Sequence, residues 1–201
     1  MAPTRSTEEA LPQLADAQRA TLLDVARRSI EHGLQTGRPL VVSASEYHPA
    51  LKAMRASFVT LQLRGQLRGC IGHLEAVQPL VVDVAENAFA AAFRDPRFAP
   101  LSRAEWPAVE IHLSILSPPE PLQFTDEADL IGQLQPGVDG LILRDGRSRG
   151  TFLPSVWEGL PDPVDFLTQL KRKAGLAANH WSEHIQVFRY RTESFADTDL
   201  A

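Results

Sequence analysis

The feature that most constrains the fold is a pair of short apolar segments on either side of a tight turn. Residues 57–63 (SFVTLQL) are rich in residues that favour β-strands. As a strand, they place Phe58 and Thr60 on one side and Val59, Leu61 and Leu63 on the other. Residues 64–66 (RGQ) have turn chemistry, and residues 67–72 (LRGCIG) return to an apolar run. The two segments therefore predict an antiparallel hairpin, and the chain must build at least one antiparallel sheet around it.

The rest of the chain is predicted to alternate between helices and further strands. Helical spacing of apolar residues, with proline and glycine at the ends, predicts helices at residues 16–34, 79–93, 126–134 and 162–174. Alternating or short apolar runs predict strands at residues 109–116, 140–143, 150–153 and 185–190. No repeat or long linker divides the chain, so residues 13–196 are predicted to form one domain, with residues 1–12 and 197–201 as flexible tails.

Composition narrows the classes of function. The formal charge of −5 over 201 residues argues against a nucleic-acid binder, which normally carries a basic stripe. No run approaches the 18 apolar residues that a membrane span needs, and the N-terminus lacks the apolar stretch of a signal peptide. A single cysteine excludes an internal disulfide and suits a reducing compartment. We therefore expect a cytoplasmic protein without a membrane partner.

That cysteine, Cys70, carries the strongest chemical signal in the sequence. It lies on the second strand of the predicted hairpin, two residues after Arg68 and between Gly69 and Gly72. A cysteine reacts as its thiolate, which a nearby cation favours, and glycines let a ligand approach the backbone closely. Cysteine is also among the most often buried residue types, so an inert core thiol is the alternative.

Motifs for cofactors and metals are absent. The sequence contains no Walker loop and no GxGxxG, GxSxG or HExxH motif. His180 and His184 have a spacing of four, but tight metal sites need three or four ligands. The sequence therefore predicts neither a metal nor a cofactor.

The turn at residues 94–98 (RDPRF) allows two interpretations. A local ion pair that ends the preceding helix is the simpler one, because exposed ion pairs are common and contribute little. In the other, Arg97 binds an anion, since guanidinium groups grip carboxylates and phosphates through two hydrogen bonds.

Six motifs in this order resemble the AMMECR domain family, known in bacteria and archaea as protein A of the AmmeMemoRadiSam system. They are LRGCIG, AFRDPRFAPL, EIHLSILSPPEPL, GVDGLIL, GTFLPSVWE and FLTQLKRKAGL, and the similarity runs from about residue 22 to residue 195. The resemblance implies an α+β fold with two unequal lobes around antiparallel sheets flanked by helices. It also implies two candidate partners, a Memo-like protein and a radical S-adenosylmethionine protein, while the family's own activity is unsettled.

The matching positions suggest roles for individual residues. In the first hypothesis the protein is a cysteine-dependent enzyme that acts on an anionic small molecule or on a protein. Cys70 is then the nucleophile and Glu110 or Lys173 carries the proton. The substrate would be bound by Arg68, Gly69, Gly72, His73 and Arg97. His73 stands at a position that varies in the family, and Ser155 stands where a glutamine is frequent. The alternative is a non-catalytic binding or scaffold protein in which the RGCIG motif is structural.

Overall fold

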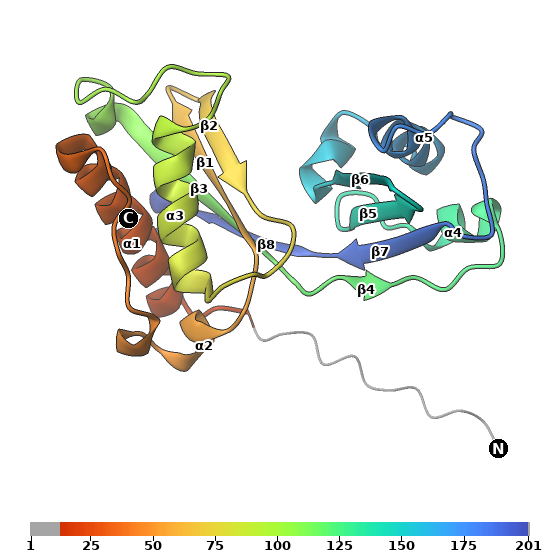
Figure 1. The fold of residues 1–201 in the computed structure, drawn as a ribbon, viewed down its shortest axis with the longest axis horizontal. Helices are drawn as coiled ribbons and strands as arrows, with labels where there is room; N and C mark the ends of the chain where they lie inside the picture. Colours follow the sequence, from red (N-terminus) through yellow and green to blue (C-terminus); the bar gives the residue numbers. More distant parts are fainter. Residues whose placement is uncertain (1–12, 201) are drawn as a thin grey trace.

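The computed structural model describes residues 13–200, which fold into two lobes of unequal size (Figure 1). Each lobe is built on a four-stranded antiparallel sheet, with strand order β2-β1-β3-β8 in the large lobe and β4-β7-β5-β6 in the small one. The α+β architecture that the sequence predicts is therefore confirmed. The predicted N-terminal tail, residues 1–12, lies outside the described residues.

The elements follow the predicted order with a few additions. The large lobe contains α1 (Asp16–Thr36), η1 (Ala44–Glu46), α2 (Pro49–Lys52), β1 (Ser57–Leu63), β2 (Gln66–Gly72), α3 (Leu80–Phe93), η2 (Trp106–Ala108), β3 (Val109–Leu116), β8 (Thr192–Ala196) and η4 (Asp197–Leu200). The small lobe contains β4 (Glu120–Pro121), α4 (Glu127–Gln133), β5 (Gly140–Asp145), β6 (Ser148–Phe152), η3 (Pro154–Glu158), α5 (Pro163–Lys173) and β7 (Gln186–Tyr190).

Helices α1 and α3 cover one face of the large sheet and leave the other face toward the small lobe (Figure 1). Because side chains alternate along a strand, Val59 and Leu61 of β1 are fully buried beneath the helices. Thr60 lies between them and points to the uncovered face, where it is half-buried. Burial of each large aliphatic side chain contributes about 1.5–3 kcal/mol, so this pattern fixes which face of the sheet is left open.

The small lobe packs α5 against its own sheet. Phe166 of α5 is fully buried and stacks on Trp157 with ring centroids 3.7 Å apart. The indole N–H of Trp157 donates to the carbonyl of Asp139 at 2.7 Å, which satisfies the polar end of this buried ring. Asp162 caps the helix by accepting hydrogen bonds from two backbone N–H groups, as the Asp-Pro pair predicts.

Two chain crossings join the lobes. Strand β3 continues into β4, and β7 continues into β8, so the chain passes twice from one sheet to the other (Figure 1). The crossings are hydrogen-bonded to each other, because the Ser117 N–H donates to the carbonyl of Arg191 at 2.8 Å. Beside them, Tyr190 is buried in a small apolar cluster with Ile142 and Leu116 from the two sheets. The lobes are therefore tied by backbone and by core, not by a loose linker.

Residues 197–200, predicted as part of a flexible tail, form the short 3-10 helix η4 in the structure. Residues 192–196 form β8, and η4 follows it. Asp197 pairs with Arg27 of α1 at 2.5 Å and accepts from the Ile111 N–H at 3.3 Å. The segment is polar in sequence, so no apolar pattern revealed that its carboxylates fasten it to the large lobe.

The edge of strand β2 is covered by the loop between α3 and η2. Asp95 accepts a hydrogen bond from the Cys70 N–H at 2.9 Å, and Arg97 donates to the Cys70 carbonyl at 3.3 Å. Further along the loop, Glu105 pairs with Arg68 at 2.8 Å. These side chains satisfy backbone groups that an edge strand would otherwise expose.

Gly69→Ala is expected to lower the free energy of unfolding by about 1–3 kcal/mol, the usual range for overpacking. A Cβ at this position would lie 2.1 Å from the backbone oxygen of Ala91 in α3, so helix and sheet would have to separate. Urea denaturation measures the effect. Gly132→Ala in α4, where a Cβ meets nothing within 4 Å, is the control and should be neutral or slightly stabilising. Equal stability of the two variants would contradict the close approach.

Glu105→Gln is expected to lower stability at pH 7 by about 1–2 kcal/mol, because it removes the charged partner of Arg68. Hydrogen bonds from Arg68, and then from Ser102, lower the pKa of Glu105 from 4.5 to about 2. The stabilisation that the Arg68–Glu105 pair provides is therefore complete above pH 4.5 and is lost as the pH falls toward about 2. Denaturation across this range should show the wild-type advantage shrinking, and a constant difference would contradict the assignment.

Candidate functional site

Cys70 lies on the uncovered face of the large sheet and is partly exposed. The hydroxyl of Thr60 donates a hydrogen bond to its sulfur at 3.2 Å. The strand register pairs Cys70 with Thr60 and Thr60 with His112, so the three side chains form a row across β2, β1 and β3. The residue is thus partly exposed, and its sulfur has a polar neighbour.

Arg97 is the cation beside this sulfur. Its guanidinium is about half exposed and pairs with the buried carboxylate of Asp95 at 2.7 Å. Asp95 chiefly, and Cys70 to a smaller degree, raise the pKa of Arg97, while the hydrogen bond from Arg97 is the main cause that holds the pKa of Asp95 well below its usual range. Both interpretations of this turn therefore find support, since the ion pair exists and also places a guanidinium next to Cys70.

Two residues of the RGCIG motif have structural surroundings instead. Arg68, predicted to orient an anionic substrate, has its guanidinium committed to Glu105 and to the carbonyl of Ala99 at 3.0 Å. Gly69, predicted to contact substrate, faces α3, because only a residue without a side chain fits against Ala91. Both residues therefore have structural contacts, and Arg97 is the cation beside Cys70. Nη1 of Arg68 is buried without a hydrogen-bond partner among residues 13–200.

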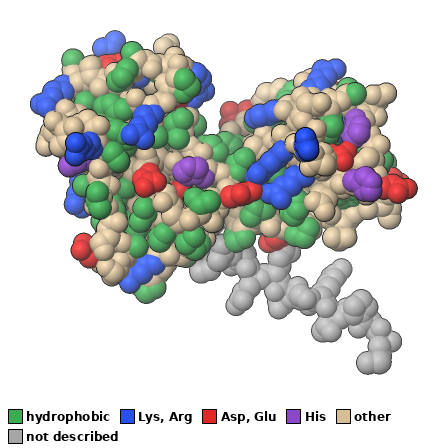
Figure 2. Space-filling model, viewed as in Figure 1, with side chains coloured by type: hydrophobic (Ala, Val, Ile, Leu, Met, Phe, Trp, Pro, Cys, Tyr) green, Lys and Arg blue, Asp and Glu red, His purple; other side chains and the backbone are tan. Residues whose placement is uncertain are grey.

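The largest of the three cavities described here is a cleft of about 680 Å³ between the lobes, at the end of β2. Figure 2 shows the hollow between the lobes, with basic, acidic and histidine side chains at their junction. The cleft brings together three predicted site residues, Gly72, His73 and Lys173, from the two lobes. Its other lining residues are Phe58, Leu74, Glu75, Val77, Arg149, Gly150 and Thr151.

The small-lobe wall of this cleft is basic. Arg149 and Arg144 both pair with Glu75 of the large lobe, at 2.8 and 3.0 Å. The ammonium of Lys173 lies 5.0 Å from the ring centroid of Phe152, and no carboxylate among residues 13–200 pairs with it. Lys173 is exposed, so its charge is available to an anionic group that enters the cleft.

His73 does not face Cys70. It follows the last residue of β2, and strand alternation turns its ring toward α3, where its Nδ1 lies 2.7 Å from a carboxylate oxygen of Asp83. A nucleophile and base couple between Cys70 and His73 is therefore not formed. His73 contributes to the cleft through its own pair with Asp83.

Glu110 lies on the same face as Cys70 but away from Lys173. Its carboxylate is partly exposed and lies 3.8 Å from Nε2 of His112. Ser114, level with the cleft residue Phe58, is four residues along the strand, which corresponds to about 13 Å. The structure therefore separates the two predicted proton carriers, with Glu110 near the row that contains Cys70 and Lys173 in the cleft.

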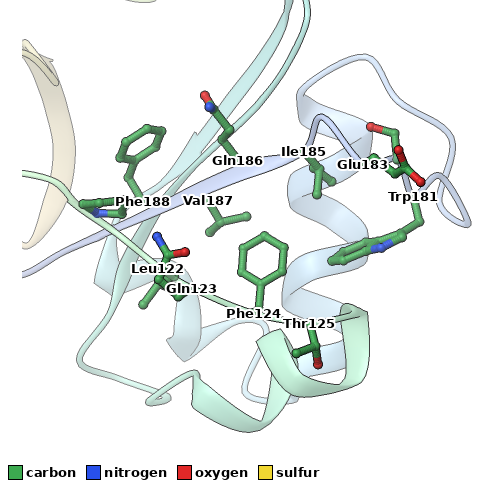
Figure 3. Close-up of a pocket in the computed structure, with 12 residues that line it drawn as sticks. Leu122, Gln123, Phe124, Thr125, Trp181, Glu183, Ile185, Gln186, Val187 and Phe188 are labelled. Carbon is green, nitrogen blue, oxygen red and sulfur yellow. The ribbon is translucent and has the colours of Figure 1, made fainter. Parts of the chain in front are cut away.

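Two other cavities contain none of the predicted substrate-binding or catalytic residues. One, of about 540 Å³, lies between the lobes and is lined by Ser114, Ser155 and Trp157 among others. The other, of about 500 Å³, belongs to the small lobe, where Figure 3 shows Phe124 and Trp181 side by side, their centroids 5.6 Å apart. The cleft at the end of β2 is therefore the candidate site.

Within residues 13–200, no group of three or more histidine, cysteine or acidic side chains is arranged to hold a metal ion. His180, considered above with His184, pairs instead with Asp145 at 2.5 Å. None of the helices in this range is both long and apolar enough to cross a membrane.

Several residues of the site carried no clear signal in the sequence. Thr60 and Asp83 are an ordinary strand threonine and an ordinary helix aspartate until the register and the packing of α3 place them. Arg149 belongs to a basic hairpin whose simplest interpretation is a solvated turn. Its position opposite Glu75 depends on how the two lobes meet.

Comparison with known proteins identifies relatives along nearly the whole chain. Residues 23–195 match the AMMECR1 family model. A protein of Methanothermobacter thermautotrophicus is 37% identical over 177 residues, covering 87% of this chain and 92% of the relative, and one of Thermofilum pendens is 34% identical, covering 92% of each.

A solved structure agrees with this assignment. The crystal structure of the uncharacterized protein PH0010 from Pyrococcus horikoshii superposes with a TM-score of 0.78 at 33% identity, covering 88% of this chain and 89% of that one. The two proteins therefore share sequence as well as fold. The chain therefore belongs to the AMMECR1 family.

Proposed function

We propose that this protein is a cysteine-dependent enzyme that acts on an anionic substrate at the junction of its lobes. The observation that carries the proposal is the surroundings of Cys70, a partly exposed residue whose sulfur accepts a hydrogen bond from Thr60 and lies beside the guanidinium of Arg97. A cysteine placed beside a cation and a hydroxyl donor is a suitable nucleophile for an anionic substrate.

Substrate binding is assigned to the cleft next to this sulfur. Gly72, two residues from Cys70 on the same face of β2, lines the cleft together with Lys173 and Arg149. Two residues along a strand correspond to about 6.6 Å, so a substrate bound in the cleft would have to extend past Gly72 by about this distance to reach the sulfur. Phe58 and Val77 supply apolar surface for the rest of the molecule.

Proton transfer near the sulfur is assigned to His112 and Glu110. Both lie on the face that carries Cys70, and Nε2 of His112 is buried with no hydrogen-bond partner among the described residues. A substrate laid over Thr60 would lie between Cys70 and His112. Glu110 lies 3.8 Å from this same Nε2, so its carboxylate is the nearby group that can exchange the proton with the imidazole.

A second candidate function, a non-catalytic binding or scaffold protein, is favoured by one specific observation. The RGCIG motif packs Gly69 against α3, and its backbone at Cys70 is held by Asp95 and Arg97. These contacts would serve architecture even without chemistry at the sulfur. The two candidates differ in what they require of the thiol, since only the enzyme needs a reactive one.

The cellular setting is also proposed. We place the protein in the cytoplasm, because one unpaired cysteine suits a reducing compartment. The family resemblance supports a Memo-like protein and a radical S-adenosylmethionine protein as partners. Co-purification from a native lysate tests them, and recovery of the chain alone at low salt would count against them.

Iodoacetamide should alkylate Cys70 in the folded protein at pH 7, and Arg97→Gln should slow the reaction about three- to fivefold. This factor corresponds to about 0.6–1 kcal/mol, the upper part of the range for an exposed charge pair. Mass spectrometry measures the rate. Arg97→Lys should restore most of it, and Arg94→Gln, in the same turn but stacked on Phe89, should leave it unchanged. A wild-type thiol that resists alkylation while folded supports the scaffold.

Cys70→Ser should reduce the rate of turnover by about 10³-fold or more without changing the fold, because serine is a much weaker nucleophile at neutral pH. The assay incubates wild type and variant with a panel of phosphorylated and carboxylated metabolites and follows each by mass spectrometry. Circular dichroism controls for folding. A compound converted equally by both proteins would refute the role of Cys70.

A further inference from the structure

The pair formed by His73 and Asp83 has surroundings that a structural ion pair does not need. Asp83 is fully buried in the first turn of α3. One of its carboxylate oxygens accepts from the Ser57 N–H at 2.9 Å, the Ser57 hydroxyl at 2.6 Å and the Asn87 amide at 2.8 Å. The other oxygen lies 2.7 Å from Nδ1 of His73. That second oxygen also accepts a longer hydrogen bond from the Gln78 amide, at 3.4 Å. The carboxylate is thus held rigidly, with its second oxygen closest to one imidazole nitrogen.

This network fixes the tautomer of His73. The other groups around Asp83 are hydrogen-bond donors, and a buried carboxylate that accepts from all of them has no proton to give. Nδ1 of His73 must therefore donate, and in the neutral ring Nε2 carries the lone pair. No hydrogen bond among residues 13–200 engages Nε2. A carboxylate that orients a histidine in this way leaves a base with one defined accepting atom.

The exposed part of His73 lines the cleft that Lys173 and Arg149 bound on the opposite side. About 45% of its side chain is exposed, while its partner Asp83 is 1% exposed. Glu75, on the same loop, also lines the cleft and pairs with Arg144 and Arg149 of the small lobe, while Glu86 of α3 accepts a hydrogen bond from Gln78. Apart from Asp83, a base at this position therefore faces a wall on which cations predominate.

We propose that His73 is a second proton-transfer residue of the cleft, with Asp83 as its positioning residue and a carboxylate- or phosphate-bearing compound as the ligand. This inference rests on the proposed function only in using the same cleft, because it does not involve the sulfur of Cys70. Lys173 and Arg149 bind the anionic group, and Leu74 and Val77 contact the apolar part of the ligand.

The step balances without any further reactant. Nε2 takes a proton from a C–H or O–H bond of the ligand, and the electron pair of that bond stays on the ligand as an anion. The cations of the small-lobe wall stabilise this anion, and Asp83 stabilises the imidazolium. Return of the proton to the same or a neighbouring atom regenerates neutral His73.

Nitrogen-15 NMR of histidine-labelled protein at pH 8 tests the tautomer, with the other five histidines as internal references. His73 should show a protonated Nδ1 and an unprotonated Nε2. The His73→Gln variant identifies the His73 signals, because they are absent from its spectrum. The fold should stay intact, since the His73 side chain is partly exposed. An Nε2–H tautomer for His73 would overturn the proposal.

Titration with malonate and with inorganic phosphate tests the ligand. Binding of either should shift the Nε2 signal, and Lys173→Gln should weaken that binding about 5- to 10-fold. Arg172→Gln, one residue away but outside the cleft lining, should leave it unchanged. A response to only one anion assigns the class to carboxylates or to phosphates. Failure of both anions to move the Nε2 signal overturns the proposal.

Repeating the titration in Cys70→Ser separates this inference from the enzyme proposal. The His73 signals should respond to the anion as in wild type, whatever the outcome of the alkylation experiment. Loss of the response in Cys70→Ser would contradict the independence of the two groups.

Discussion

The candidate site depends first on the two chain crossings between the lobes. Ser117 and Arg191 are hydrogen-bonded where β3 passes into β4 and β7 passes into β8. Because the chain passes between the two sheets at these points, the lobes lie side by side, and residues of β6 and the end of α5 line the same cleft as the end of β2. A cleft with walls from both lobes follows directly from this connection.

The second constraint is the way in which strand β2 is held. It lies at the edge of its sheet, and the loop after α3 supplies a carboxylate and a guanidinium to its backbone at Cys70. The same contacts that satisfy an exposed strand edge also bring Arg97 to the sulfur. Structural and chemical demands therefore coincide at this position, which explains why the motif supports both an enzyme and a scaffold interpretation.

The site divides into two parts that share one sheet. Cys70, Thr60 and His112 form a row across three strands, whereas His73 and Lys173 face each other in the cleft at the end of β2. Strand alternation is the physical reason for the division, because Cys70 and His73 are an odd number of residues apart and so point to opposite faces. One part contains the cysteine, and the other contains the histidine together with the cations of the small lobe.

The sequence alone determined the elements and the family. Alternation in residues 57–63 and 109–116 and helical spacing in residues 16–34 depend on local burial patterns, and six ordered motifs identified the relatives. Only the tertiary structure decided which side chains meet. Arg68 pairs with Glu105, 37 residues away, and Asp83 reaches His73 through the packing of α3. Such contacts depend on how faces pack together, which no local pattern records.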